Sequence, residues 1–129
     1  MFAKTARLLM ITGALALAMA GTLPASAKGA DVVKHGSCSQ SSDWKLKLSP
    51  DNGKIEVEFE VDSNVNGQTW HVQIFKDGAQ ILATNKVTRA PSGSFQVRKL
   101  ATDPMGRDTF RARAHNNASG ENCVGVASI

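Results

Sequence analysis

Two stretches of alternating side chains carry most of the groups that could recognise another molecule. The six residues are His71, Gln73 and Phe75 in the first stretch and Arg111, Arg113 and His115 in the second. Residues two apart in a β-strand point to the same face, so each trio shares a face. If the two strands are neighbours, the trios form one positive, hydrogen-bonding surface with a single aromatic ring. Arginine mixed with aromatic side chains is favoured at the centres of protein interfaces.

This surface predicts a binding site for an acidic partner, either a protein or a component of the cell envelope. The alternative is an ordinary solvated strand face with Phe75 packed under a neighbouring strand, because scattered apolar residues are normal on protein surfaces. The sequence leaves both interpretations open. The formal net charge is only +4, and nucleic-acid binding is not expected because it requires clustered Lys and Arg with interleaved aromatic residues.

The three histidines, His35, His71 and His115, offer no recognisable catalytic site. No Ser, Cys or carboxylate is spaced to act beside them as a nucleophile or an orienting group. The sequence contains no nucleophile elbow, phosphate loop or metalloprotease pattern. We therefore expect a protein that is not an enzyme and that uses no cofactor.

Three glutamates alternate along one stretch and could be interpreted as metal ligands. A metal site would require ligands that converge from several loops. We expect instead a solvated ladder in which the glutamates lie between basic residues of the two flanking strands, each exposed pair adding a few tenths of a kcal/mol at most. The six residues of this ladder are Glu56, Glu58, Glu60, Lys45, Lys47 and Arg98.

Cys38 and Cys123 are the only two cysteines in the chain. An isolated pair in an exported protein predicts a disulfide. A reactive thiol or half of a zinc site is the alternative, but zinc needs further His or Cys ligands nearby. The predicted bridge joins an N-terminal arm to the last strand.

The first 27 residues have the organisation of a cleaved secretory signal peptide. Lys4 and Arg7 precede an apolar run from Leu8 to Met19, and Ala25-Ser26-Ala27 matches the small-residue pattern before a cleavage site. The apolar run is shorter than the ~20 residues that a membrane-spanning helix needs. We expect a secreted monomer without membrane attachment, either free in the extracellular space or associated with the cell wall.

Seven stretches show the apolar–polar alternation of half-buried β-strands. They are residues 43–49, 54–62, 68–76, 80–84, 94–100, 109–115 and 121–129. Pro50-Asp51-Asn52-Gly53 is expected to form a turn because proline presets φ and Asn-Gly accepts positive φ. Asp77-Gly78 favours a type I′ hairpin turn, which needs positive φ. Because no helix is predicted, this spacing favours an antiparallel sandwich or barrel.

The stretch FRARAHNNASGE, which begins at Phe110, resembles the sixth strand and following loop of fibronectin type III and immunoglobulin-like domains. Trp70 resembles the core tryptophan on the third strand of immunoglobulin-like domains. Phe110 stands where these families usually carry Tyr. The leader resembles those of small secreted proteins from high-GC Gram-positive bacteria. The resemblance implies a seven-stranded antiparallel immunoglobulin-like sandwich with one disulfide.

The predicted organisation is a signal peptide over residues 1–27, a flexible arm over residues 28–42 and the sandwich over residues 43–129. In the implied topology, strand 54–62 lies between strands 43–49 and 94–100, and strand 68–76 neighbours strand 109–115.

The expected function is a non-catalytic binding or structural role in the extracellular space or cell envelope. Immunoglobulin-like folds also serve as spacers and inhibitors, so fold alone does not decide among these roles. One alternative is a secreted inhibitor that presents a loop to an enzyme, with Ser63–Gly67 and Asn116–Gly120 as the candidate loops. A second alternative is a carrier of a small apolar ligand, which would require an interior cleft of ~300–1,000 Å³.

Overall fold

The structure is a computed structural model that describes residues 29–129. The predicted signal peptide lies outside the described residues. All regular secondary structure in the described part is β-strand. The strands are β1 (Val32–Ser37), β2 (Asp43–Asp51), β3 (Lys54–Asp62), β4 (Thr69–Lys76), β5 (Ala79–Val87), β6 (Ser94–Thr102), β7 (Thr109–His115) and β8 (Asn122–Ser128).

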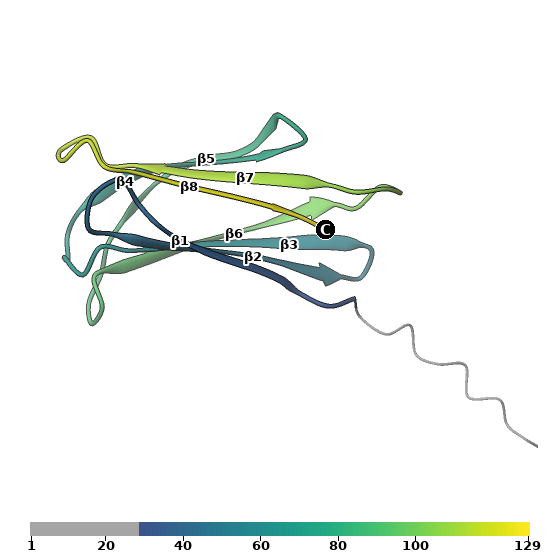
Figure 1. Cartoon of the computed structure of the whole chain (residues 1–129), viewed down its shortest axis with the longest axis horizontal. Coiled ribbons are helices and arrows are strands. Elements are labelled where there is room, and N and C mark those ends of the chain that lie inside the picture. Colours follow the sequence, from purple (N-terminus) through teal and green to yellow (C-terminus); the bar gives the residue numbers. More distant parts are fainter. Residues whose placement is uncertain (1–28) are drawn as a thin grey trace, which may run out of the picture.

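The strands form two antiparallel sheets that pack face to face (Figure 1). One sheet has the order β1-β2-β3-β6, and the other has the order β5-β4-β7-β8. The predicted neighbours are confirmed, because β3 lies between β2 and β6, and β4 pairs with β7. The fold is therefore an all-β, two-sheet antiparallel sandwich, and this arrangement is compatible with an immunoglobulin-like fold.

The prediction of seven strands is wrong by one, because β1 is an additional strand. It lies within residues 28–42, the stretch predicted as a flexible arm, and pairs with β2 along its whole length. The alternation that reveals a strand is weak here because Lys34 and Gly36 share a face with Val32, and Lys34 is exposed. His35 consequently lies on a strand, opposite Lys45.

A second correction concerns β5, which runs from Ala79 to Val87, whereas the sequence predicts a strand that ends at Thr84. The predicted hairpin turn at Asp77-Gly78 is confirmed, and the turn predicted over residues 50–53 is confined to Asn52-Gly53 because β2 continues to Asp51. Asn52-Gly53 connects β2 to β3 and Asp77-Gly78 connects β4 to β5, with positive φ at all four residues. Positive φ at both central positions is the requirement of the type I′ turn.

The core consists of the inward side chains of both sheets. Trp70 on β4, Phe59 on β3 and Phe110 on β7 are completely buried. The ring of Trp70 lies 6.2 Å from the ring of Phe95 on β6, so aromatic contacts connect the two sheets. The prediction that Trp70 is a buried residue of a central strand is confirmed.

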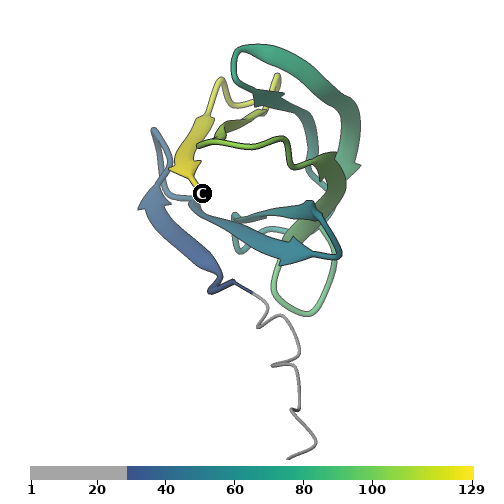
Figure 2. The same ribbon diagram turned by 90° about the vertical axis from the view of Figure 1, so that its right-hand side faces the viewer.

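β8 of one sheet lies beside β1 and β2 of the other sheet (Figure 2). The Trp44 side chain on β2 packs between the two sheets at this edge. A Cβ atom on Gly36 would lie 2.5 Å from the Trp44 indole, and one on Gly125 would lie 2.6 Å from it. Both distances are shorter than van der Waals contact. Glycine on β1 and on β8 is therefore needed because the indole occupies the space that a side chain would fill.

The predicted disulfide between Cys38 and Cys123 is confirmed. Cys38 follows β1 and Cys123 lies on β8, so the bridge joins the two sheets near the edge that Trp44 fills. The described part of the chain contains no free cysteine.

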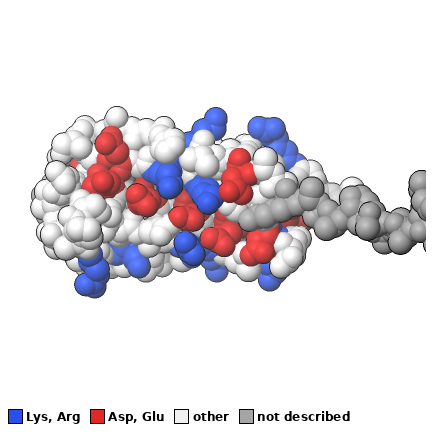
Figure 3. All heavy atoms as spheres, turned by 90° about the horizontal axis from the view of Figure 1, so that it is seen from below, with Lys and Arg blue, Asp and Glu red and all other residues white. Residues whose placement is uncertain are grey.

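The outer face of the β1-β2-β3-β6 sheet carries the predicted charge ladder. Glu58 lies opposite Lys47 on β2 and opposite Arg98 on β6, which confirms the predicted register. Arg98 is within ion-pair distance of both Glu56 and Glu58. Seen from this side, acidic and basic side chains are interspersed (Figure 3). Lys47 forms its ion pair with Asp31, just before β1, so Glu56 and Glu58 pair with Arg98 and not with Lys47.

Candidate recognition surface

The two trios of predicted site residues lie side by side on the outer face of the β5-β4-β7-β8 sheet. The register of β4 and β7 pairs His71 with His115, Gln73 with Arg113 and Phe75 with Arg111. His71 and Arg111 are exposed, and the other four side chains are half-buried. The structure thus brings all six residues together.

Phe75 has a cation above its ring. The guanidinium carbon of Arg111 lies 5.7 Å from the centre of the Phe75 ring, within the range of a cation–π interaction. The contact holds the arginine over the aromatic ring, and the side chain of Phe75 remains half-buried.

β8 extends this surface with two exposed valines that sequence reasoning missed. Val124 lies opposite Arg113 and Val126 lies opposite Arg111. Their side chains are 41% and 52% exposed. The alternation of β8, with Cys123, Gly125 and Ala127 inward, was the signal that could have located them. We call the outer side of β4, β7 and β8 the recognition face; it comprises His71, Gln73, Phe75, Arg111, Arg113, His115, Val124 and Val126.

One end of the recognition face is hollowed into a depression of about 440 Å³. Phe75, Arg111 and Val126 line it, together with Thr109 and the Asp77-Gly78 turn. Apolar and cationic groups converge at this end, and the Asp77 carboxylate beside them accepts a hydrogen bond from the backbone N–H of Thr109. A partner that inserts an apolar group beside a carboxylate would match this lining.

A buried carboxylate lies behind this end of the face. Asp108 is 3% exposed, and its nearest cation is the Lys76 ammonium at 3.8 Å. Its backbone exchanges hydrogen bonds with Ile129, which fixes the start of β7 against the C-terminus. Burial raises the pKa of Asp108; Lys76 opposes the shift, and the nearby Asp103 and Asp77 add to it.

We expect Asp108→Asn to be more stable than the wild type at neutral pH. A raised pKa means that the folded state keeps the Asp108 proton to a higher pH than the unfolded chain does. This contribution to stability is full below the ordinary Asp value of 3.8 and is lost as the pH rises through the raised folded-state pKa. The asparagine removes the ionisation, and Lys76 keeps its hydrogen bond to Thr102.

Urea unfolding at about pH 3 and about pH 7 measures this difference. The stability of Asp108→Asn minus that of the wild type should be larger at the higher pH than at the lower pH. The same difference for Asp43→Asn, a substitution at an exposed position, should not increase. A variant that is less stable than the wild type at neutral pH would mean that the ion pair with Lys76 outweighs the burial of Asp108.

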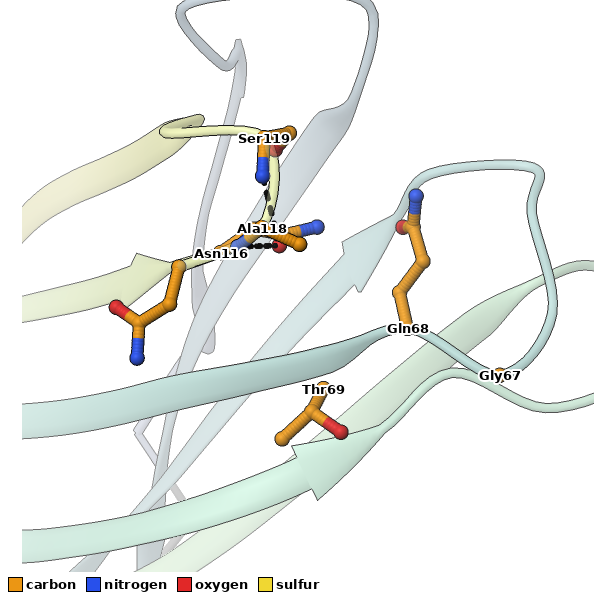
Figure 4. A pocket seen from close by; sticks show the side chains of 7 residues that line it. Gly67, Gln68, Thr69, Asn116, Ala118 and Ser119 are labelled. Atoms are coloured by element: carbon orange, nitrogen blue, oxygen red, sulfur yellow. Dashed lines mark hydrogen bonds between the residues drawn. The ribbon is translucent and has the colours of Figure 1, made fainter.

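The two predicted candidate loops lie at the other end of the same sheet. The β3–β4 and β7–β8 connections flank a depression of about 560 Å³. Figure 4 shows Gly67, Gln68 and Thr69 on one side of it and residues 116–119 on the other. Gln68, Thr69, Asn117 and Ser119 contribute amide and hydroxyl groups to the lining. The depression is open to solvent, whereas the carrier hypothesis requires an interior cleft.

The β7–β8 loop is held by an extensive set of hydrogen bonds. The buried Asn116 side chain accepts bonds from the backbone N–H groups of Ala118 and Ser119 (Figure 4). The N–H of Gly120 donates to the carbonyl of Asn116, and the N–H of Asn116 donates to the carbonyl of Glu121. The loop is thus fixed by its own backbone and by one buried asparagine.

No protein-family model, curated protein or solved structure matches this chain. Within residues 29–129, no three His, Cys, Asp or Glu side chains gather as a metal site, and no helix is long and apolar enough to cross a membrane. The geometry of the described residues therefore carries the functional argument.

Proposed function

We propose that this protein is a secreted, non-catalytic recognition module that binds an acidic protein or cell-envelope component through the recognition face. The observation that carries the proposal is the placement of Arg111 and Arg113 beside a half-buried aromatic ring on β4 and two exposed valines on β8. Arginine and aromatic residues in one patch are typical of the residues that dominate binding energy at interfaces.

The arginines on the outer faces of the two sheets differ in whether they form ion pairs. Arg98 on the ladder is within ion-pair distance of two glutamates. Among the described residues, neither Arg111 nor Arg113 forms an ion pair. Their positive charge is thus available to a partner, and carboxylates or phosphates are the groups that guanidinium binds best.

Secretion and an immunoglobulin-like identity are part of this proposal. The leader sequence over residues 1–27 supports export, and the disulfide supports an oxidising compartment. The sheet orders support the immunoglobulin-like assignment, with β1 as an added edge strand. The fold favours a binding role only by analogy, because sandwiches of this kind serve many functions.

Reversing both arginines, Arg111→Glu with Arg113→Glu, is expected to abolish binding of the partner. The reversal replaces attraction by repulsion at the centre of the recognition face, and each disrupted charge pair weakens binding by ~2–5 kcal/mol. The oxidised protein is immobilised and exposed to culture medium and cell-envelope extract, and the species retained by the wild type are compared with those retained by the variant.

The matched control is Lys34→Glu with Lys54→Glu, which makes the same change in net charge at exposed positions of the opposite sheet. This control variant should retain the partner. If the arginine variant still retains the partner, the partner does not bind through the recognition face. If both variants lose the partner equally, net charge alone explains retention and the recognition face is again excluded as the specific site.

The second candidate function is a secreted inhibitor that presents the β7–β8 loop to an enzyme. The hydrogen bonds that fix residues 116–120 favour it, because a rigid loop binds without a large loss of conformational entropy. This function predicts that the retained species is an enzyme, and that replacing Asn116 by Ala weakens its retention while the arginine reversal does not.

A further inference from the structure

A row of four side chains crosses one end of the recognition face and continues onto β5, with two histidines between two asparagines. His71 on β4 lies directly opposite His115 on β7. The row continues to Asn85 on β5 beside His71 and to Asn122 on β8 beside His115. Side chains that lie directly opposite on antiparallel strands have Cβ atoms about 4.5–5.5 Å apart, so the two imidazoles are within reach of one shared ligand.

Each histidine of this row is oriented by its neighbouring asparagine. The Nδ1 atom of His71 lies 3.0 Å from Oδ1 of Asn85, and Nδ1 of His115 lies 2.8 Å from Oδ1 of Asn122. An amide oxygen only accepts hydrogen bonds, so both Nδ1 atoms carry a hydrogen and donate it. In the neutral ring, the lone pair is then on Nε2.

We propose that His71 and His115 bind one divalent transition-metal ion through their Nε2 atoms. Histidine ligands of metals usually donate their other ring N–H to an oxygen acceptor, which fixes the tautomer and the ring orientation. Both rings of the row have that arrangement, on two different strands. Imidazole nitrogen suits copper, nickel and zinc, whereas magnesium and calcium prefer oxygen.

The described residues supply no third ligand of the usual kinds near this pair. The remaining coordination positions are therefore open to water or to a donor atom of another molecule. Gln73 and Arg113 occupy the next row, and the positive charge of Arg113 repels a cation. We therefore expect moderate affinity, with Cu²⁺ bound more tightly than Ni²⁺ or Zn²⁺, as for most sites with nitrogen ligands.

The test is calorimetric titration of the untagged, oxidised protein with Cu²⁺, Ni²⁺ and Zn²⁺ in separate experiments. The wild type should bind one ion per chain. His71→Gln and His115→Gln should each weaken binding by more than about tenfold. Asn122→Ala, which removes the oxygen that orients His115, should weaken it by about tenfold. Because imidazole binds metal only in its neutral form, acidification should release the ion.

His35→Gln is the matched control, because His35 is exposed on β1 in the other sheet. It should bind metal as the wild type does, and thermal unfolding of every variant verifies that it is folded. Absence of binding by the wild type, or wild-type affinity in both His71→Gln and His115→Gln, would overturn the proposal. The titration contains no protein partner, so its outcome is independent of the proposed function.

Discussion

Removing the disulfide, by Cys38→Ser with Cys123→Ser, is expected to lower the free energy of unfolding by about 4 kcal/mol. The bridge spans 85 positions, and a cross-link over a loop of that length strongly restricts the unfolded chain. A domain of this size has a total stability of only ~5–15 kcal/mol. Urea unfolding of the double variant and of the wild type measures the difference.

Reduction of the wild type provides the control for the disulfide experiment. The reduced wild type should unfold at the same urea concentration as the double serine variant, because both lack the same cross-link. A double variant within about 1 kcal/mol of the oxidised wild type would show that the unfolded chain is restricted by other means.

Glu121→Ala is expected to lower the free energy of unfolding by about 3 kcal/mol. The Glu121 side chain is buried and accepts three hydrogen bonds from the segment after β1. The donors are the backbone N–H of Gln40, the backbone N–H of Ser42 and the hydroxyl of Ser42. Alanine leaves all three without their acceptor, and those of Ser42 are buried.

Two further variants define the role of the Glu121 carboxylate, again by urea unfolding. Glu121→Gln keeps one acceptor oxygen and should lose roughly half as much stability as Glu121→Ala. Glu60→Ala removes a glutamate from the charge ladder and should change stability by no more than about 0.5 kcal/mol. Equal, small effects of Glu121→Ala and Glu60→Ala would contradict the role assigned to Glu121.

The disulfide and the Glu121 hydrogen bonds connect the same two segments, residues 38–42 after β1 and residues 121–123 at the start of β8. Cys38 bonds to Cys123, while Gln40 and Ser42 donate to Glu121 two positions before that cysteine. Because the contacts are adjacent, the losses from removing both should not be additive. The β7–β8 loop ends next to these contacts. The disulfide and the Glu121 hydrogen bonds therefore position one candidate binding loop as well as the edge of the sandwich.

The sequence predicts most of the sandwich because its strands alternate clearly. β3 buries Ile55, Val57, Phe59 and Val61 and turns the half-buried glutamates between them to the outer face, so the period of two is clear. The pairing of β4 with β7 follows from the implied strand order, whereas the residue-by-residue register of the pair is given only by the structure. β1 escapes prediction because Lys34 and Gly36 stand opposite Leu46 and Trp44, where apolar residues are expected, and Lys34 is exposed.

The candidate site is predictable only where its residues alternate within one strand. The trios on β4 and β7 were identified in this way. Val124 and Val126 were missed because β8 is rich in small residues. The hydrogen bonds of Asn85 and Asn122 to the histidines could not be predicted, because they depend on the register of four strands. Glu121 was missed because its donors lie about 80 positions away in the chain.

Site-specific photo-crosslinking tests the central claim most directly. A photoreactive residue replaces Gln73, at the centre of the recognition face, or Lys45, a half-buried position on the outer face of the opposite sheet. Both proteins are irradiated in cell-envelope extract and in culture medium. We predict a covalent adduct from position 73 that disappears with the Arg111→Glu and Arg113→Glu reversal, and none from position 45. No adduct from position 73, or equal adducts from both positions, would contradict the assignment of recognition to this face.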